Sequence, residues 1–408
     1  MKSKIIYIKS FVFLLLLFFH YAIIQNIYFL VSYLQYEIGF KNIEFYSKYI
    51  DKQILKVKKI DKPKISIISP VYNREKFLFR FLKSIQHQNF KDIEIIFVDD
   101  NSSDDSAKLI KEFINKDKRI SLIKNSKNRG TFISRNIGAL YSKGKYLIMP
   151  DPDDIISNNI LSTCYNLAER YKFDFIRFNV YLGKGKLSYN YFSKNHENKP
   201  IYQPELSTHV YYGNKEIGII DCYMTNKFIK KTTYLKALNY LNNFYFHIYM
   251  TFMEDSLMNF IIYRVAKSYY FTRIIGYRYF KNSASITNKL YLISELRLKF
   301  AFYYVKCIFE YSKNTKYEKD MANLLFSNLE KDFDIGRLLS SAIFNKDEFI
   351  FYDNICNIFL NSTFISDDNK LIFQNLKKII DKKNQSYIIS LRNNKTLSNM
   401  TNHKNLKR

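Results

Sequence analysis

The segment between residues 64 and 151 alternates apolar runs with amphipathic stretches, and this alternation constrains the fold more than any other feature. The run IEIIFVDD (93–100) is apolar almost throughout, as expected for a parallel strand that is covered on both faces. The stretch REKFLFRFLKSIQHQ (74–88) instead places its apolar residues at helical spacing. Strands are predicted at 64–69, 93–100, 120–125 and 145–151, and helices at 74–88, 103–116 and 131–144. This order predicts an α/β fold with a doubly wound sheet.

The pattern is looser beyond residue 158. The sequence predicts a strand at 173–180 and helices at 226–241 and 254–267. From about residue 290 onward the apolar residues recur at helical spacing. We therefore predict an α/β domain, a helical C-terminal region and a polar tail, at 63–290, 291–384 and 385–408 respectively.

The N-terminus contains an uncharged apolar stretch from Phe11 to Leu34, which follows three lysines. A helix of that length would rise about 36 Å, enough to cross a bilayer. We predict a single-pass membrane anchor at 1–34 and a basic linker at 35–62. A cleaved signal peptide is the alternative, because the densest apolar part ends at Phe19, but no small-residue cleavage pattern follows it. Lysines flank both ends, so the side of the membrane stays open; a eukaryotic source would place the chain in the Golgi or ER.

The formal net charge of +27 predicts a basic surface. Such a surface suits anionic lipid, nucleotide phosphates or nucleic acid. No helix-turn-helix or aromatic-basic recognition motif is present, so we predict no nucleic-acid partner. The four cysteines and six histidines are scattered, which predicts neither a zinc site nor a disulfide framework.

Polar residues follow three of the predicted strands: SPVYNR (69–74), the pair Asp99–Asp100, and PDPDD (150–154). The carboxyl ends of parallel strands meet at one edge of the sheet, where ligands bind. Carboxylates crowded there repel one another unless a cation separates them, and ligands that are all oxygen favour Mg²⁺ or Mn²⁺. The alternative is that these residues only form turns and caps.

The spacing within PDPDD divides the roles of its acids. In extended backbone Asp151 and Asp153 project to the same side, and Pro152 stiffens the turn. One carboxylate could hold a metal while the other orients a ribose hydroxyl or a water. Asp154 is predicted to cap a helix that begins near Ile155.

Four motifs agree in order and spacing with one known family: SPVYNR, VDDNSSD, RNIGALYSKGKYLIMPDPDD and MEDSLMNF. Through them the chain resembles the family 2 glycosyltransferases of the GT-A fold, strongly over 64–160 and weakly to about residue 287. The resemblance implies a nucleotide-sugar donor with UDP favoured, a glycan, lipid or protein hydroxyl as acceptor, and inversion at the anomeric carbon. The chain has no Trp and so lacks the Q-x-x-R-W motif of processive synthases, which favours a non-processive enzyme.

The resemblance also implies residue roles on the donor side. Asp100 is similar to the acid that contacts the nucleotide base, with Pro70 and Tyr72 walling that base. Asp151 and Asp153 resemble the DxD pair, Asp153 as the direct ligand of Mn²⁺ or Mg²⁺ and Asp151 as a metal-site residue nearer the ribose.

The remaining roles are implied in the same way. Arg135 resembles a recurrent arginine assigned to the donor side, and Asp255 resembles the catalytic base that takes the proton of the acceptor hydroxyl. The alternative for Glu254–Asp255 is an acidic helix N-terminus. Arg278 and Lys281, in GYRYFKNSASIT (276–287), are similar to residues of a loop over the donor phosphates, or they belong to an exposed basic loop.

A different function class stays open at this point. A chain of this kind could keep the GT-A fold without turnover, as a basic binding protein tethered to the membrane. Acids at every matched position count against that alternative.

Overall fold

The computed structural model describes the chain in several stretches. They are residues 62–182, 186–187, 200–203, 206, 223–241, 249–251, 253–280, 300, 303, 307, 352–353, 356–357, 360–361 and 367–405. The predicted anchor at 1–34 lies outside them, as does the predicted linker up to residue 61. Within the stretches that are described, no helix combines the length and the apolar character needed to cross a membrane.

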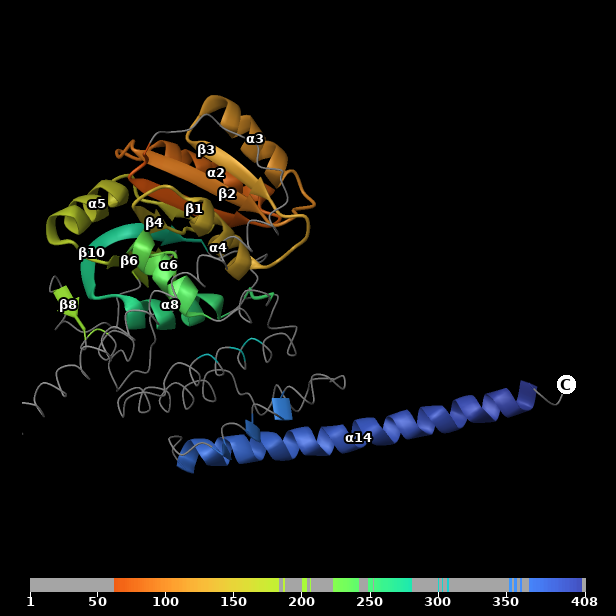
Figure 1. The fold of residues 1–408 in the computed structure, drawn as a ribbon. Helices are drawn as coiled ribbons and strands as arrows, with labels where there is room; N and C mark the ends of the chain where they lie inside the picture. The colour runs from red at the N-terminus through yellow and green to blue at the C-terminus, as the bar shows by residue number, and fades with distance from the viewer. Residues whose placement is uncertain are drawn as a thin grey trace, which may run out of the picture.

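The first half of the sheet is parallel and confirms the predicted alternation (Figure 1). Its strands lie in the order β3-β2-β1-β4, with bounds β1 (Ile65–Val71), β2 (Ile93–Asp99), β3 (Ile120–Lys124) and β4 (Tyr146–Ile148). Val71 pairs with Asp99 in register, so β1 and β2 end side by side. The polar residues that follow these strands therefore start from one edge of the sheet.

The second half makes the sheet mixed. The order continues β9-β6-β10-β5, and β7 and β8 pair with β6 and β10. The bounds are β5 (Ile155–Ile156), β6 (Phe175–Leu182), β7 (Lys186–Leu187), β8 (Pro200–Tyr202), β9 (Lys227–Lys230) and β10 (Ser268–Tyr279). Strand β9 runs antiparallel to both β4 and β6, and Tyr277 of β10 pairs with Ile156 of β5. This last pairing brings the end of β10 to the segment that follows PDPDD.

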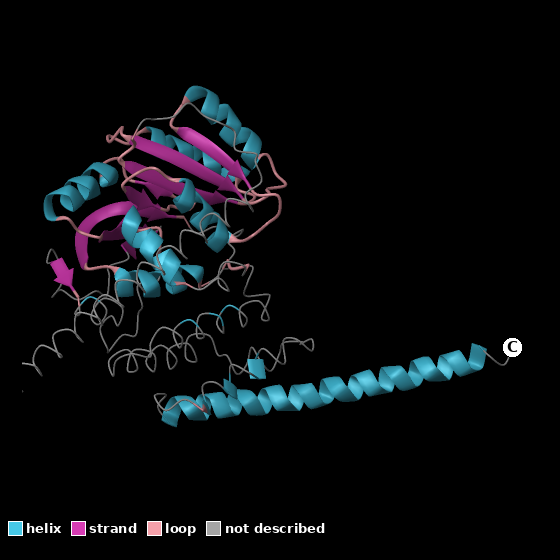
Figure 2. Cartoon of the chain, in the orientation of Figure 1, coloured by secondary structure: helices cyan, strands magenta, loops and turns pink. Residues whose placement is uncertain are grey.

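Helices cover both faces of the sheet (Figures 1 and 2). Alternate residues of β1 enter different cores: Ile67 packs in the cluster that contains Leu78 of α2, and Ile68 packs in the cluster that contains Ile133 of α4. The first cluster is lined by α2 (Glu75–Gln86), α3 (Ser106–Lys116) and α5 (Ile160–Tyr171). The second is lined by α4 (Thr131–Tyr141), α6 (Lys231–Tyr240) and α8 (Glu254–Val265).

Two predicted elements differ from the structure, and one helix crosses a predicted boundary. No helix begins near Ile155, because the β-branched pair Ile155–Ile156 extends the sheet beside β10. The predicted helix at 226–241 starts as strand β9 and becomes helix α6 only at Lys231. Helix α14 (Asp367–Asn405) runs through residue 385, where the polar tail was predicted to begin.

Gly144 lies where the chain enters β4, and it cannot accept a side chain without movement of β1. A Cβ there would lie 2.6 Å from the backbone nitrogen of Ser66 and 2.5 Å from its Oγ. We expect Gly144→Ala to lower the free energy of unfolding by about 1–3 kcal/mol, because the central strand must shift. Urea denaturation measures this, with Lys143→Ala at the exposed neighbouring position as the control. Equal stability of the two variants would contradict the expectation.

Candidate active site

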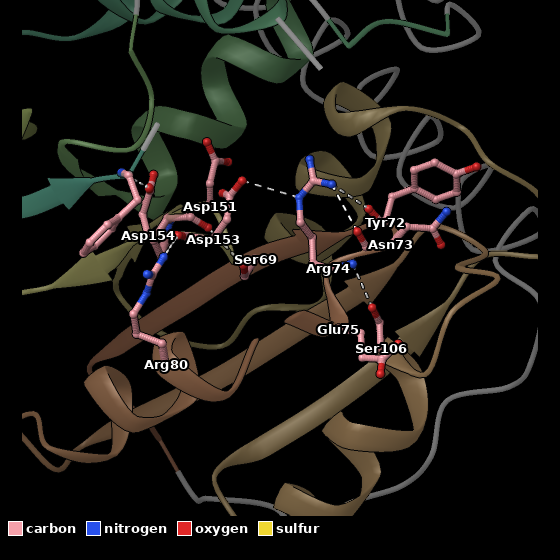
Figure 3. Close-up of polar contacts among 12 residues, drawn as sticks. Ser69, Tyr72, Asn73, Arg74, Glu75, Arg80, Ser106, Asp151, Asp153 and Asp154 are labelled. Atoms are coloured by element: carbon pink, nitrogen blue, oxygen red, sulfur yellow. Dashed lines mark hydrogen bonds and ion pairs between the residues drawn. The ribbon is translucent and has the colours of Figure 1, made fainter. Parts of the chain in front are cut away.

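The PDPDD turn after β4 meets the turn after β1 (Figure 3). It also meets the first turn of α8 through Arg135, and the end of β10 through Asp154. The Ser69 hydroxyl donates to the carbonyl oxygen of Pro150 at 3.0 Å, which ties the end of β1 to the PDPDD turn. The predicted meeting of these strand ends is confirmed for the residues that the structure describes.

Arg135 of α4 joins two of the predicted site acids. Its Nη2 donates to Asp151 at 2.7 Å, and its Nη1 pairs with Asp255 and lies 3.4 Å from Glu254. Burial acts to lower the pKa of Arg135, but the charges of Asp255, Asp151 and Glu254 outweigh it and raise the pKa. The guanidinium therefore stays charged. Asp151, which follows β4, and Asp255, on α8, are thus bound by different nitrogens of one guanidinium.

Asp255 is held by contacts on both carboxylate oxygens. Oδ1 pairs with Arg135, and Oδ2 accepts a hydrogen bond from the backbone N–H of Met224 at 3.1 Å. Burial raises the pKa of Asp255 above its ordinary value; the charge of Arg135 opposes this shift and that of Asp151 adds to it. A carboxylate with a raised pKa in a polar site can accept a proton. Asp255 also lies in the first turn of α8, as expected if it only forms an acidic helix N-terminus, so its role as a base stays a prediction.

Asp154 does not cap a helix, and the local prediction for it was wrong. One of its oxygens accepts a hydrogen bond from the Tyr277 hydroxyl, and the other accepts from the backbone N–H of Phe280 at 2.8 Å. The Tyr277 oxygen in turn accepts from the backbone N–H of Asp151 at 3.1 Å. Burial, with the charges of Asp151 and Asp153, raises the pKa of Asp154 to about 8. Asp154 thus fixes the PDPDD turn to the end of β10.

Removing the Tyr277 hydroxyl should loosen this attachment. We expect Tyr277→Phe to lower the free energy of unfolding by about 1–3 kcal/mol, because the buried Asp154 loses a donor and the Asp151 N–H loses its acceptor. Urea denaturation compares it with Tyr171→Phe, a half-exposed tyrosine outside the site. If the two variants unfold at the same urea concentration, the bridge contributes nothing.

The carboxylates of the PDPDD turn fit a divalent cation. Asp151, Asp153 and Asp154 offer ligand oxygens that lie within 4.8 Å of one another. Asp154 is buried, with both of its oxygens bonded to the end of β10, whereas Asp151 and Asp153 are partly exposed and are the better candidates for ligands. Hard oxygen ligands suit Mg²⁺ or Mn²⁺. Burial is the main cause of the raised pKa of Asp154, and the charges of Asp151 and Asp153 add to it, so the three carboxylates repel one another.

Asp100 is buried under the loop that follows β3. Its oxygens accept hydrogen bonds from Asn125 Nδ2 and from the backbone N–H groups of Arg129 and Gly130, each at 2.8 Å. Burial raises its pKa despite these bonds. Gly130 has φ +88°, a conformation that L side chains rarely adopt. Asp100 thus shapes this loop, and its contact with a nucleotide base stays a prediction.

The two residues predicted to wall the base lie in different environments. Pro70 is buried within β1, whereas Tyr72 is 39% exposed in the turn that follows. Tyr249, which the sequence did not indicate, lies near both Tyr72 and Asp100. Burial raises the pKa of Tyr249, a hydrogen bond with Thr251 opposes the shift, and the charges of Asp100 and Tyr72 add to it. Two partly exposed tyrosines, Tyr72 and Tyr249, therefore lie near Asp100.

The segment 276–287 is only partly a loop. Residues up to Tyr279 belong to β10, and the guanidinium of Arg278 lies 4.9 Å from the centroid of the Tyr181 ring. The described contacts place Arg278 against Tyr181 rather than against the PDPDD turn. Lys281 lies outside the described residues.

Two arginines of the α2 region contact Asp153, and the sequence reading assigned neither to the site. Arg74 places Nε 3.5 Å from Oδ2 of Asp153. Arg80 donates from Nη2 to the backbone carbonyl of Asp153 at 2.5 Å, with its guanidinium 3.7 Å from the Phe280 ring centroid. The position of Arg74 within SPVYNR could have indicated it. Nothing in the sequence indicated Arg80 as a site residue, because it belongs to an ordinary amphipathic helix.

Comparisons with known proteins match part of the chain to one family. The family model described as Glycosyl transferase family 2 matches residues 66–236. A glycosyltransferase of Haemophilus influenzae is 41% identical over 104 residues, which are 26% of this chain and 42% of that protein. The GalNAc(5)-diNAcBac-PP-undecaprenol beta-1,3-glucosyltransferase of Campylobacter jejuni is 38% identical over 107 residues, 26% of this chain and 35% of that protein. These matches therefore span less than half the length of either relative.

A longer match and the solved structures extend the comparison. EpsJ of Bacillus subtilis, a glycosyltransferase, is 26% identical over 248 residues, 59% of this chain and 70% of that protein. The crystal structure of residues 1–349 of TarS from S. aureus, in complex with UDP, has a TM-score of 0.57 and 15% identity, covering 80% of this chain and 92% of that one. At this identity the likeness shows the fold alone, and it confirms the predicted GT-A fold. Residues 66–236 therefore match the family 2 glycosyltransferases, and the chain is similar to proteins of that family in sequence and to TarS in fold.

Proposed function

We propose that this protein transfers a sugar from a nucleotide-sugar, with a UDP-sugar favoured, to a hydroxyl group of a glycan, lipid or protein. The observation that carries the proposal is the single guanidinium of Arg135, which lies between Asp151 and Asp255. It brings Asp151, the acid assigned to the donor, close to Asp255, the candidate base. TarS, which shares the fold, has been crystallised with UDP and with UDP-GlcNAc, and this supports a donor of that class.

Asp255 is the base of the proposed reaction. Its carboxylate takes the proton of the acceptor hydroxyl as that oxygen attacks the anomeric carbon, and the nucleoside diphosphate leaves from the opposite face. Attack from one face with departure from the other inverts the anomeric centre. Arg135 orients the Asp255 carboxylate, and its positive charge opposes the rise in the pKa of Asp255 that burial causes.

The donor is bound from the strand ends. Tyr72 and Pro70 border the base and Asp100 contacts it, while Asp151 orients the ribose. Asp153, with Asp151, would hold Mn²⁺ or Mg²⁺. A divalent cation at this position would supply the positive charge that the leaving diphosphate requires.

A panel of nucleotide-sugars tests this function. The full chain is incubated with Mn²⁺ and each donor, and free nucleoside diphosphate is measured with and without EDTA. We expect at least one donor to be turned over, EDTA to stop the reaction, and added Mn²⁺ to restore it. Turnover that persists in EDTA would contradict the proposed metal dependence. The absence of turnover for every donor, tested with a range of hydroxyl acceptors, would contradict the proposed activity.

We also propose that residues 1–34 anchor the enzyme in a membrane, through the uncharged stretch from Phe11 to Leu34. Separately, we propose that the enzyme is non-processive and adds one sugar or a few, since the chain lacks the Q-x-x-R-W motif of processive synthases. Alkaline carbonate extraction tests the anchor. The full chain should stay with the membrane pellet and a chain lacking residues 1–34 should be released; release of both would contradict it.

A further inference from the structure

Arg74 points a positive charge at the carboxylate that we assign to the metal (Figure 3). Its Nε lies 3.5 Å from Oδ2 of Asp153, and each of the two side chains is only 14% exposed. Its Nη1 donates to the carbonyl oxygens of Tyr72 and Asn73, each at 3.2 Å. Within the described part of the chain, no hydrogen bond or ion pair involves its Nη2. The guanidinium is thus fixed to the turn through one nitrogen and keeps another available for a ligand.

The backbone that carries Arg74 is pinned independently of Asp153. Its own N–H donates to the Ser106 hydroxyl at 2.9 Å, and the N–H of Asn73 donates to the Ser102 hydroxyl at 3.1 Å. The Asn73 side chain accepts from the N–H of Ser103 at 2.8 Å. The guanidinium can therefore change its partner while the turn that positions it stays in place.

A divalent cation and the Arg74 guanidinium require the same carboxylate. The cation carries the higher charge and binds carboxylate oxygen directly, so it displaces the long ion pair at Asp153. The displaced guanidinium then faces the diphosphate that the donor brings to the same cation. A planar guanidinium binds phosphate oxygens through paired N–H donors, which an ammonium cannot do.

We propose that Arg74 binds the diphosphate of the nucleotide-sugar donor and that, without donor, it competes with the divalent cation for Asp153. This inference rests on the proposed function, since it requires a donor with a diphosphate. Arg74 is then a donor-binding residue, held close to its working position before the donor arrives.

The competition is tested with Mn²⁺ alone, by electron paramagnetic resonance titration of the full chain without nucleotide. We expect Arg74→Gln to bind Mn²⁺ about fivefold more tightly than the wild type, because a partly exposed ion pair of up to about 1 kcal/mol no longer opposes the metal. Arg170→Gln, an exposed arginine of α5, makes the same change in net charge and should leave the affinity unchanged. Unchanged or weaker Mn²⁺ binding by Arg74→Gln would show that Arg74 only supports Asp153, and would overturn the competition.

The diphosphate contact is tested by titrating UDP and UMP in saturating Mn²⁺. We expect Arg74→Gln to weaken UDP about tenfold and UMP less than twofold, with Arg74→Lys between wild type and Arg74→Gln for UDP. Equal losses for UDP and UMP, or no loss for either, would overturn the contact. The proposed function fails separately, if the wild type releases no nucleoside diphosphate from any nucleotide-sugar.

Discussion

Asp255→Asn should lower the rate of sugar transfer by about 10²–10⁴-fold, the usual contribution of a positioned general base. The amide is close in size to the carboxylate, and its single oxygen can still accept a hydrogen bond from Arg135 in place of the ion pair. Its NH2 group then faces the Met224 N–H, which loses its acceptor. It cannot take the proton of the acceptor hydroxyl. Donor affinity should change little, because the residues assigned to the donor lie at the ends of β1, β2 and β4.

Steady-state kinetics with the donor identified from the panel measure the effect, and donor affinity is titrated on the same samples. Asp92→Asn changes an exposed acid just before β2; it is the control and should keep the wild-type rate. A rate for Asp255→Asn within threefold of the wild type would leave Glu254–Asp255 as an acidic helix N-terminus and nothing more.

Replacing Arg135 by Met should lower the free energy of unfolding by about 3–5 kcal/mol, the cost of leaving buried charges without their partner. Arg135 is almost fully buried, and it pairs with Asp151, Glu254 and Asp255. Burial and the charge of Asp255 already raise the pKa of Glu254, and the charge of Arg135 opposes this shift. Without the guanidinium the acids of this cluster take up protons or the end of α8 moves.

Urea denaturation at neutral pH measures this loss. Arg135→Lys is the informative companion, since it keeps the charge but reaches its partners through one ammonium instead of a fork, and it should lose less. Arg170→Gln, which removes an exposed arginine, should stay within about 0.5 kcal/mol of the wild type. If Arg135→Met unfolds at the wild-type urea concentration, the guanidinium does not hold this cluster together.

The sequence predicted the parallel half of the fold well, for a physical reason. Strands β1 and β2 are buried on both faces, so their apolar runs are nearly continuous and unmistakable. Asp151 and Asp153 were predicted as site residues because they follow the apolar run that forms β4. Strand β9 was missed because NKFIKKTTYLKALNYL also has helical spacing, and only its pairing with β4 and β6 makes its first residues a strand.

The contacts that give the acids distinct roles were not predictable from the sequence. Asp154 was assigned as a cap because a local rule considers only its neighbours in the chain. In the structure its partners are Tyr277 and Phe280 of a distant strand end. Arg135 was placed on the donor side by resemblance alone; its pairing with Asp255 depends on how α4 and α8 pack on the same face of the sheet.

The central claim is that the acids after β4 belong to a working transferase site, and donor turnover by Asp153→Asn tests it most directly. Release of nucleoside diphosphate from the turned-over donor is measured with Mn²⁺ for the wild type, Asp153→Asn and the exposed control Asp92→Asn. We expect a loss of at least about 100-fold for Asp153→Asn, since the lost ligand removes electrostatic stabilisation of the leaving group, and wild-type rates for Asp92→Asn. Equal turnover by Asp153→Asn and the wild type would contradict the site, and a wild type that turns over no donor would favour a binding protein that keeps this fold without its reaction.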